Sequence, residues 1–126
     1  MPINSTLIIN RAEWLTPDNP RARGIGSYLY ERERKLKCCL GFESLACGLT
    51  IEQICGYNYP HAVYPQPNIK SFQHLLDSQL NTRLAAVNDE PNIRPGLRER
   101  IIQELFKEFW NIDVIFEGSF PTNGAL

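Results

Sequence analysis

Apolar residues recur at helical spacing in the second half of the chain. Between residues 96 and 110 they return every three or four positions with charged residues between them, and a similar stripe runs through residues 70–88. This spacing is typical of amphipathic helices, and it predicts one helix in the last segment and one or two in the earlier one. Residues 112–117 are instead β-branched and partly alternating, which predicts a strand.

Residues that begin or end helices mark the limits of several segments. Pro95 suits the first turn of the last helix, and Asn111 can end it. Gly48 can close a helix that begins near residue 39, and residues 50–53 match the capping box of a second short helix that ends at residue 54 or 55. Helices are therefore expected near residues 40–55, 70–88 and 96–110.

Residues 27–39 predict a β-hairpin. Two short apolar or aromatic runs, at 27–30 and 36–39, flank a charged run at 31–35, as in antiparallel strands joined by a solvated turn. A helix over residues 28–36 is the alternative, because glutamate and arginine are good helix formers.

The hairpin and the final strand together predict the fold class. We expect one α+β domain over residues 1–126, in which the hairpin and the C-terminal strand form a small antiparallel sheet that packs with three to five helices. An exposed edge of such a sheet makes a homodimer plausible.

The remaining segments carry weaker signals. Asn10 can cap a short helical turn at residues 11–15, and the prolines of residues 16–20 stop it. Residues 57–68 contain three prolines and are expected to form an irregular surface loop. The tail at residues 118–126 is expected to be flexible.

Composition and charge narrow the classes of function. The 126 residues carry 13 basic and 14 acidic side chains, and the net charge of -1 provides no bulk attraction for duplex nucleic acid or anionic lipid. Apolar runs are too short to span a bilayer, and the N-terminus has no leader pattern. The chain is therefore expected to be soluble and cytoplasmic.

Four cysteines suggest three alternatives. Zinc binding is disfavoured because Cys38, Cys39, Cys47 and Cys55 contain no CxxC pair. A thiol nucleophile with His61 or His74 as its base remains open, since both histidines flank the same loop region. The favoured interpretation is that the thiols are reduced and buried. We accordingly expect no catalytic set, no metal and no cofactor.

A glycine-marked segment is the strongest candidate for ligand binding. Gly24 and Gly26 lie next to Arg21 and Arg23, and backbone amides with guanidinium groups can hold a phosphate. A tight turn with solvated arginines is the alternative. The tyrosines of the 57–68 loop can stack on a ligand or partner, or anchor the loop to its own domain. The residues predicted to bind ligand are Arg21, Arg23, Gly24, Gly26, Tyr28, Tyr57 and Arg98.

No pair of carboxylates stands out for acid–base catalysis. Asp89 and Glu90 are merely adjacent in the sequence. The pair Asn88-Asp89 is expected to provide a left-handed cap and a turn at the end of a helix.

A set of short motifs resembles a family. The motifs are Gly24-x-Gly26-x-Tyr28-Leu29, Cys38-Cys39-Leu40-Gly41-Phe42, Ala86-Val87-Asn88-Asp89, Arg98-Glu99-Arg100-Ile101 and Ile112-Asp113-Val114-Ile115-Phe116. Over about residues 10–118 they resemble a group of small proteins encoded by tailed phages and prophages. The group has no established activity, so the resemblance implies a biological setting and transfers no functional residue.

This setting orders three hypotheses for function. The first is a non-catalytic phage accessory protein that counters host defence by binding, in its sharper form by sequestering a phosphate-bearing nucleotide signal. The second is an inhibitor that binds a host protein through the aromatic loop and a helix face. The third is a thiol- or metal-dependent enzyme.

Overall fold

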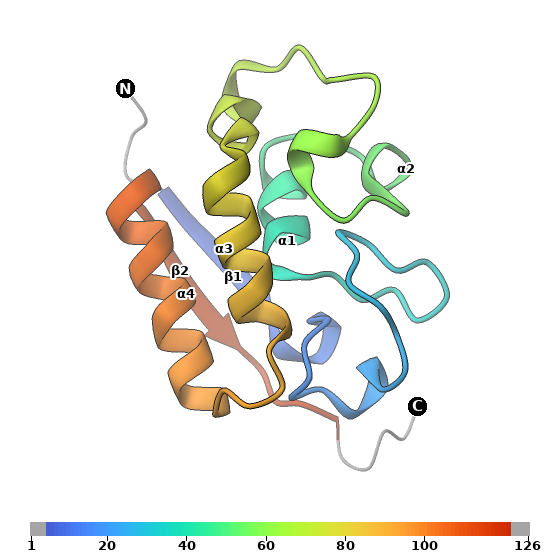
Figure 1. Cartoon of the computed structure of the whole chain (residues 1–126), viewed down its shortest axis with the longest axis vertical. Coiled ribbons are helices and arrows are strands. Elements are labelled where there is room, and N and C mark those ends of the chain that lie inside the picture. Colours follow the sequence, from blue (N-terminus) through green and yellow to red (C-terminus); the bar gives the residue numbers. More distant parts are fainter. Residues whose placement is uncertain (1–4, 122–126) are drawn as a thin grey trace.

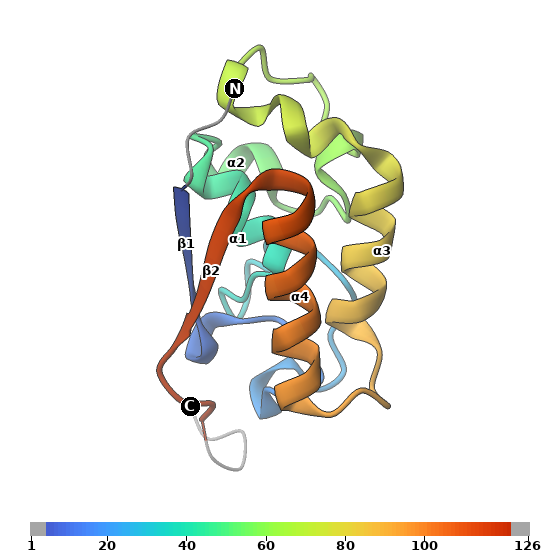
Figure 2. The same cartoon turned by 90° about the vertical axis from the view of Figure 1, so that its left-hand side faces the viewer.

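The computed structural model describes residues 5–121 and has the predicted α+β fold. Strands β1 (Ser5–Asn10) and β2 (Ile112–Glu117) form a two-stranded sheet. Helices α1 (Cys39–Ala46) and α4 (Pro95–Trp110) pack against it. Helix α3 (Ser78–Asp89) packs on both of them, farther from the sheet (Figures 1 and 2).

The sheet is parallel, so the prediction of an antiparallel sheet is wrong. Ser5 pairs with Ile112 and Asn10 with Glu117, and the chain between them forms one long crossover. Strand β1 was not predicted, because its apolar run from Leu7 to Ile9 spans only three residues. Leu7 and Ile9 face the core, while Ile8 is 50% exposed, as the two-residue period of a strand requires.

The predicted hairpin is present only as a turn. Glu31 and Leu36 form a single antiparallel bridge, and Lys35 in the turn has a φ of 60°. The flanking segments pair with other parts of the chain: the amide of Leu29 donates to the carbonyl of Tyr57, and the amide of Leu15 donates to that of Lys37. The two hairpin strands predicted at residues 27–30 and 36–39 are therefore wrong, whereas the predicted C-terminal strand is present as β2.

The predicted helices are confirmed, including several of their ends. Helix α1 leads to α2 (Ile51–Ile54), which begins with the predicted capping box between Thr50 and Gln53. The stripe at residues 70–88 forms two elements, the 3-10 helix η4 (Lys70–Leu76) and α3, whose first turn is capped by Asp77. Helix α4 ends at Asn111 in the left-handed conformation, and this reversal leads directly into β2.

Three short 3-10 turns complete the chain. They are η1 (Arg11–Glu13), capped as predicted by Asn10, then η2 (Pro20–Ala22), and η3 (Pro60–Ala62) within the irregular loop. In the predicted tail, Phe120 stacks on Trp14 with ring centroids 6.0 Å apart. Residues 122–126 of that tail lie outside the described residues.

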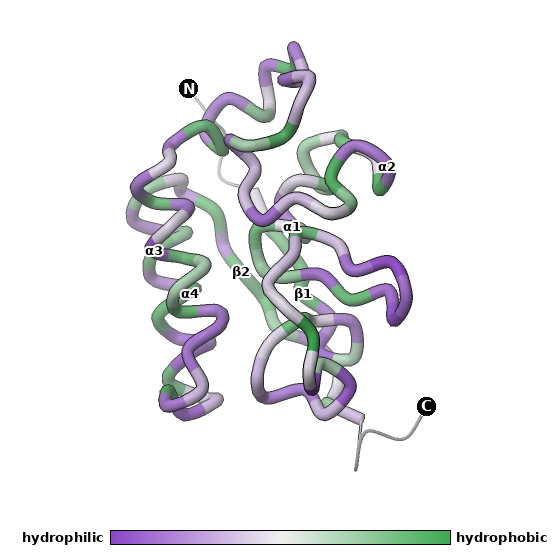
Figure 3. Tube along the Cα trace, turned by 45° about the vertical axis from the view of Figure 1, so that its right-hand side comes forward, coloured by the Kyte–Doolittle hydropathy of each residue, from purple (hydrophilic) through white to green (hydrophobic). Residues whose placement is uncertain are grey.

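The core lies between the sheet and the helices. Large side chains that are fully buried come from most elements and include Ile9, Trp14, Leu40, Phe72, Leu84 and Phe106. Figure 3 shows the hydrophilic residues gathered on outer segments such as the charged turn at residues 31–35. Across residues 5–121, no helix combines the length and apolar character needed to cross a membrane.

Candidate functional site: a pocket at the glycine-marked segment

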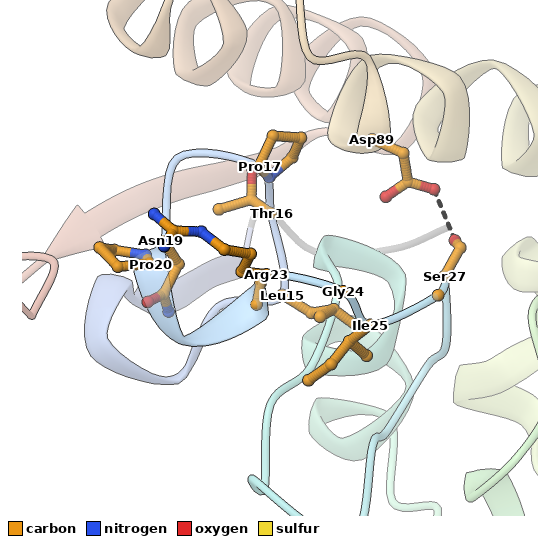
Figure 4. Close-up of a pocket in the computed structure, with 12 residues that line it drawn as sticks. Leu15, Thr16, Pro17, Asn19, Pro20, Arg23, Gly24, Ile25, Ser27 and Asp89 are labelled. Atoms are coloured by element: carbon orange, nitrogen blue, oxygen red, sulfur yellow. Dashed lines mark hydrogen bonds between the residues drawn. The ribbon is translucent and has the colours of Figure 1, made fainter. Parts of the chain in front are cut away.

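A pocket of about 310 Å³ lies between residues 15–27 and the C-terminal end of α3 (Figure 4). Three of the predicted ligand-binding residues, Arg23, Gly24 and Gly26, line it. The remaining lining residues are Leu15, Thr16, Pro17, Asn19, Pro20, Ala22, Ile25, Ser27 and Asp89.

Local capping interactions shape one wall of the pocket. Asn19 is 1% exposed, and its side chain accepts a hydrogen bond from the amide of Arg21 while it donates to the carbonyl of Trp14. Pro20 then begins η2, as its fixed φ favours. Gly24 follows with a φ of +78°, a conformation that glycine adopts without steric cost, and it turns the chain toward Ser27.

Asp89 forms the opposite side of the pocket. Its carboxylate accepts hydrogen bonds from the Ser27 hydroxyl and from the side-chain amide of Asn88. Asn88 is fully buried, accepts from the indole of Trp14 at 2.7 Å and donates to the carbonyl of Leu15 at 2.7 Å. This network fixes the end of α3 against the glycine-marked segment.

Both residues of the Asn88-Asp89 pair are still helical, so the expected left-handed cap is wrong. Asp89 was missed as a pocket residue because its partner Ser27 lies 62 positions away in the sequence. No local spacing rule indicates such a pair.

The pocket carries one cation and one anion on separate sides. In Figure 4, Arg23 lies on the side of Pro20, whereas Asp89 reaches Ser27 on the other side. The exposed guanidinium of Arg23 has no hydrogen-bond or ion-pair partner among the described residues. Within residues 5–121, the amides of Gly24 and Gly26 also lack an acceptor. These groups are available to a bound molecule.

Arg21 lies outside the pocket and braces the charged turn. Its guanidinium donates to the carbonyl of Arg34 at 3.1 Å, and the Arg34 guanidinium donates in return to the carbonyls of Arg21 and Arg23. Arg21 and Arg23 therefore do not converge on one ligand.

Arg98 lies in the interior, away from the pocket lining. It is 0% exposed and donates to the carboxylate of Asp18 and to four backbone carbonyls near the end of α3. Those carbonyls belong to Val87, Asn88, Glu90 and Ile93. Because every guanidinium nitrogen already has a partner, this arginine is structural.

The two tyrosines predicted to bind ligand pack against apolar clusters of the protein instead. Tyr28 packs with Ile25 on a second, small apolar cluster, and its ring lies 3.5 Å from the position that a Cβ on Gly26 would take. Tyr57 packs on the main core, and its hydroxyl donates to the carbonyl of Tyr64. Four of the seven predicted residues thus lie outside the pocket lining.

All four cysteines are free thiols, but only two of them are buried, so the expectation of buried thiols is met only in part. Cys38 and Cys39 are buried in the core at the start of α1. Burial raises the pKa of Cys38 to about 12 and that of Cys39 well above its usual range. Cys47 and Cys55 are only partly buried.

Comparison with known proteins assigns neither a family nor a function to this chain. No protein-family model, curated protein or solved structure matches this chain. The phage setting indicated by the motifs stays a prediction, and the pocket has to be interpreted from its own chemistry.

Proposed function

We propose that this chain is a non-catalytic phage accessory protein that acts in the host cytoplasm and counters a host defence by binding a phosphate-bearing nucleotide. The observation that carries the proposal is a pocket whose lining combines the unpaired Arg23 and the amides of Gly24 and Gly26 with Asp89. Arg23 and Asp89 lie on separate sides of it (Figure 4). The motifs that resemble phage proteins supply the biological setting.

The two sides of the pocket suit the two polar parts of a nucleotide. A guanidinium binds phosphate with two parallel hydrogen bonds, and backbone amides next to glycine add further donors. On the other side, Asp89 can accept hydrogen bonds from ribose hydroxyl groups. A second phosphate placed there would be repelled by the carboxylate, so the pocket favours one phosphate and one ribose.

The size of the pocket sets a limit on the ligand. Its volume of about 310 Å³ lies at the lower end of the 300–1,000 Å³ typical of ligand sites. We therefore propose a nucleoside monophosphate or a fragment of that size as the ligand, in preference to a dinucleotide.

Inhibition of a host protein through the aromatic loop receives less support. Tyr57 and Tyr59 pack on the core, and Tyr59 stacks on His61 with ring centroids 5.1 Å apart. Among the tyrosines of this loop only Tyr64, which is 81% exposed, projects into solvent. One projecting ring is a weak basis for an interface, because binding energy concentrates in clusters of buried anchors.

A thermal-shift panel on the full chain tests the proposed ligand class. Ribonucleoside monophosphates are expected to raise the melting temperature, because a ligand that binds only the folded state stabilises it. The matching nucleosides, which lack the phosphate, and inorganic phosphate, which lacks the ribose, should produce smaller shifts at the same concentration. Equal shifts from nucleoside and nucleotide, or no shift from any compound, would contradict the proposal.

A further inference from the structure

A second cluster of reactive side chains lies in a different cavity of about 710 Å³. Glu43, Cys47 and His74 line this cavity, which shares no lining residue with the pocket at Arg23. Glu43 lies on α1, and Cys47 is the C-cap residue of that helix four positions later, so the two side chains lie on one face. His74 reaches them from η4.

The three side chains direct their donor atoms at one another. His74 Nε2 lies 2.7 Å from Glu43 Oε2, Cys47 Sγ lies 3.3 Å from the same oxygen, and Sγ lies 3.8 Å from Nε2. In residues 5–121 this is the one group of at least three histidine, cysteine or acidic residues whose ligand atoms lie within 4.8 Å of one another.

This arrangement differs from that of a thiol nucleophile with an oriented base. In such a triad the carboxylate binds one ring nitrogen and the thiol faces the other. Here both Glu43 and Cys47 face Nε2 of His74, so the carboxylate competes with the thiol for the same nitrogen. Convergence of nitrogen, oxygen and sulfur on one point is instead the geometry of a metal site.

From this convergence we propose that Glu43, Cys47 and His74 bind a zinc ion through Oε2, Sγ and Nε2. Tetrahedral bonds of about 2.0 Å to oxygen and nitrogen and about 2.3 Å to sulfur place the ligand atoms about 3.3–3.6 Å apart. The two separations that involve Cys47 already lie near these values. The 2.7 Å separation between Glu43 and His74 is that of a hydrogen bond, and the ion would replace that bond and widen the separation by about 0.6 Å.

Charge and burial also fit a dication. Glu43 is only 5% exposed, and a carboxylate removed from water requires a compensating charge or full hydrogen bonding. A thiolate from Cys47 and the carboxylate would together neutralise Zn²⁺, and His74 would bind as a neutral ligand.

Neighbouring groups hold the ligands in place. The ring of His74 packs edge-on against Trp110 with centroids 4.9 Å apart, and the hydroxyl of Ser71 donates to the carbonyl of Cys47. These two contacts restrict the ring of His74 and the backbone of Cys47. The three protein ligands leave the fourth position of the ion toward the cavity, where water or a small anion would bind.

Cobalt and zinc titrations of the metal-stripped full chain test this site. We expect one equivalent of Co²⁺ to produce the thiolate charge-transfer band and the strong visible bands of a four-coordinate ion. Adding azide should shift the visible bands, because the fourth position is open. A wild-type spectrum without the thiolate band would overturn the zinc site, and visible bands unmoved by azide would overturn the open position.

Two matched cysteine variants extend the test. Cys47→Ser should abolish the thiolate band and weaken zinc binding at least about 100-fold, since loss of second-shell partners alone costs 10–100-fold. Cys55→Ser alters a partly buried thiol outside the cluster, and it should leave the thiolate band and the zinc affinity unchanged. Equal zinc affinity in the two variants would contradict the assignment. The cobalt spectrum of the wild-type chain decides the question even if Cys47→Ser fails to fold.

Discussion

Replacing Arg98 with methionine is expected to lower the free energy of unfolding by about 3–5 kcal/mol, the usual cost of removing one partner of a buried ion pair. The guanidinium is 0% exposed and donates to Asp18 and to four carbonyls around the end of α3. Methionine fills similar space but leaves all of these acceptors without their donor. Urea denaturation followed by circular dichroism measures the loss.

Two further variants show whether the hydrogen bonds of Arg98 are responsible. Arg98→Lys keeps the charge but not the planar fork of donors, so it should recover only a small part of the stability. Arg100→Met alters an exposed arginine on the same helix and should change stability by no more than about 0.5 kcal/mol. An Arg98→Met protein as stable as Arg100→Met would contradict the structural role.

Replacing Gly41 with alanine is expected to destabilise the protein by about 3 kcal/mol or more, although alanine is the better helix former. A Cβ at Gly41 would lie 1.8 Å from the carbonyl oxygen of Leu29. The Leu29 backbone cannot easily retreat, because its amide donates to the carbonyl of Tyr57 at 2.8 Å. Thermal unfolding should show a decrease in Tm of about 10 °C.

Gly96 provides the matched control for this substitution. It also lies in a helix, but a Cβ there would meet no atom within 4 Å. Gly96→Ala should therefore leave the protein unchanged or stabilise it by up to about 1 kcal/mol. If Gly41→Ala behaved like Gly96→Ala, the close packing of α1 on residue 29 would be wrong.

Local signals predicted the helices well because the causes of those helices are local. The capping box at Thr50 and the left-handed Asn111 involve neighbours within a few residues. The sheet depends instead on pairing between residues 5–10 and 112–117, more than 100 positions apart. A short apolar run carries no information about which distant strand it will join, or in which direction.

At the candidate site, too, local patterns were predictive and long-range contacts were not. The glycine-marked segment was found from its local pattern, and Arg23 does line a pocket there. The roles of the other two arginines depend on distant partners. Arg98 is buried beside Asp18, and Arg21 donates a hydrogen bond to the carbonyl of Arg34 in the charged turn. Asp89 was not predicted to line the pocket for the same reason, since its partner Ser27 is distant in the sequence. Residue type alone cannot separate an arginine that binds ligand from one that satisfies buried carbonyls.

Calorimetric titration of a ribonucleoside monophosphate into wild-type, Arg23→Ala and Arg32→Ala proteins tests the nucleotide pocket most directly. Arg32 is an exposed arginine on the charged turn and does not line the pocket. Loss of charge-assisted hydrogen bonds, worth about 1.5–3 kcal/mol, should weaken binding by Arg23→Ala about 10- to 100-fold. Arg32→Ala should bind like the wild type. No binding by the wild-type protein, or equal affinity in the two variants, would contradict the nucleotide pocket.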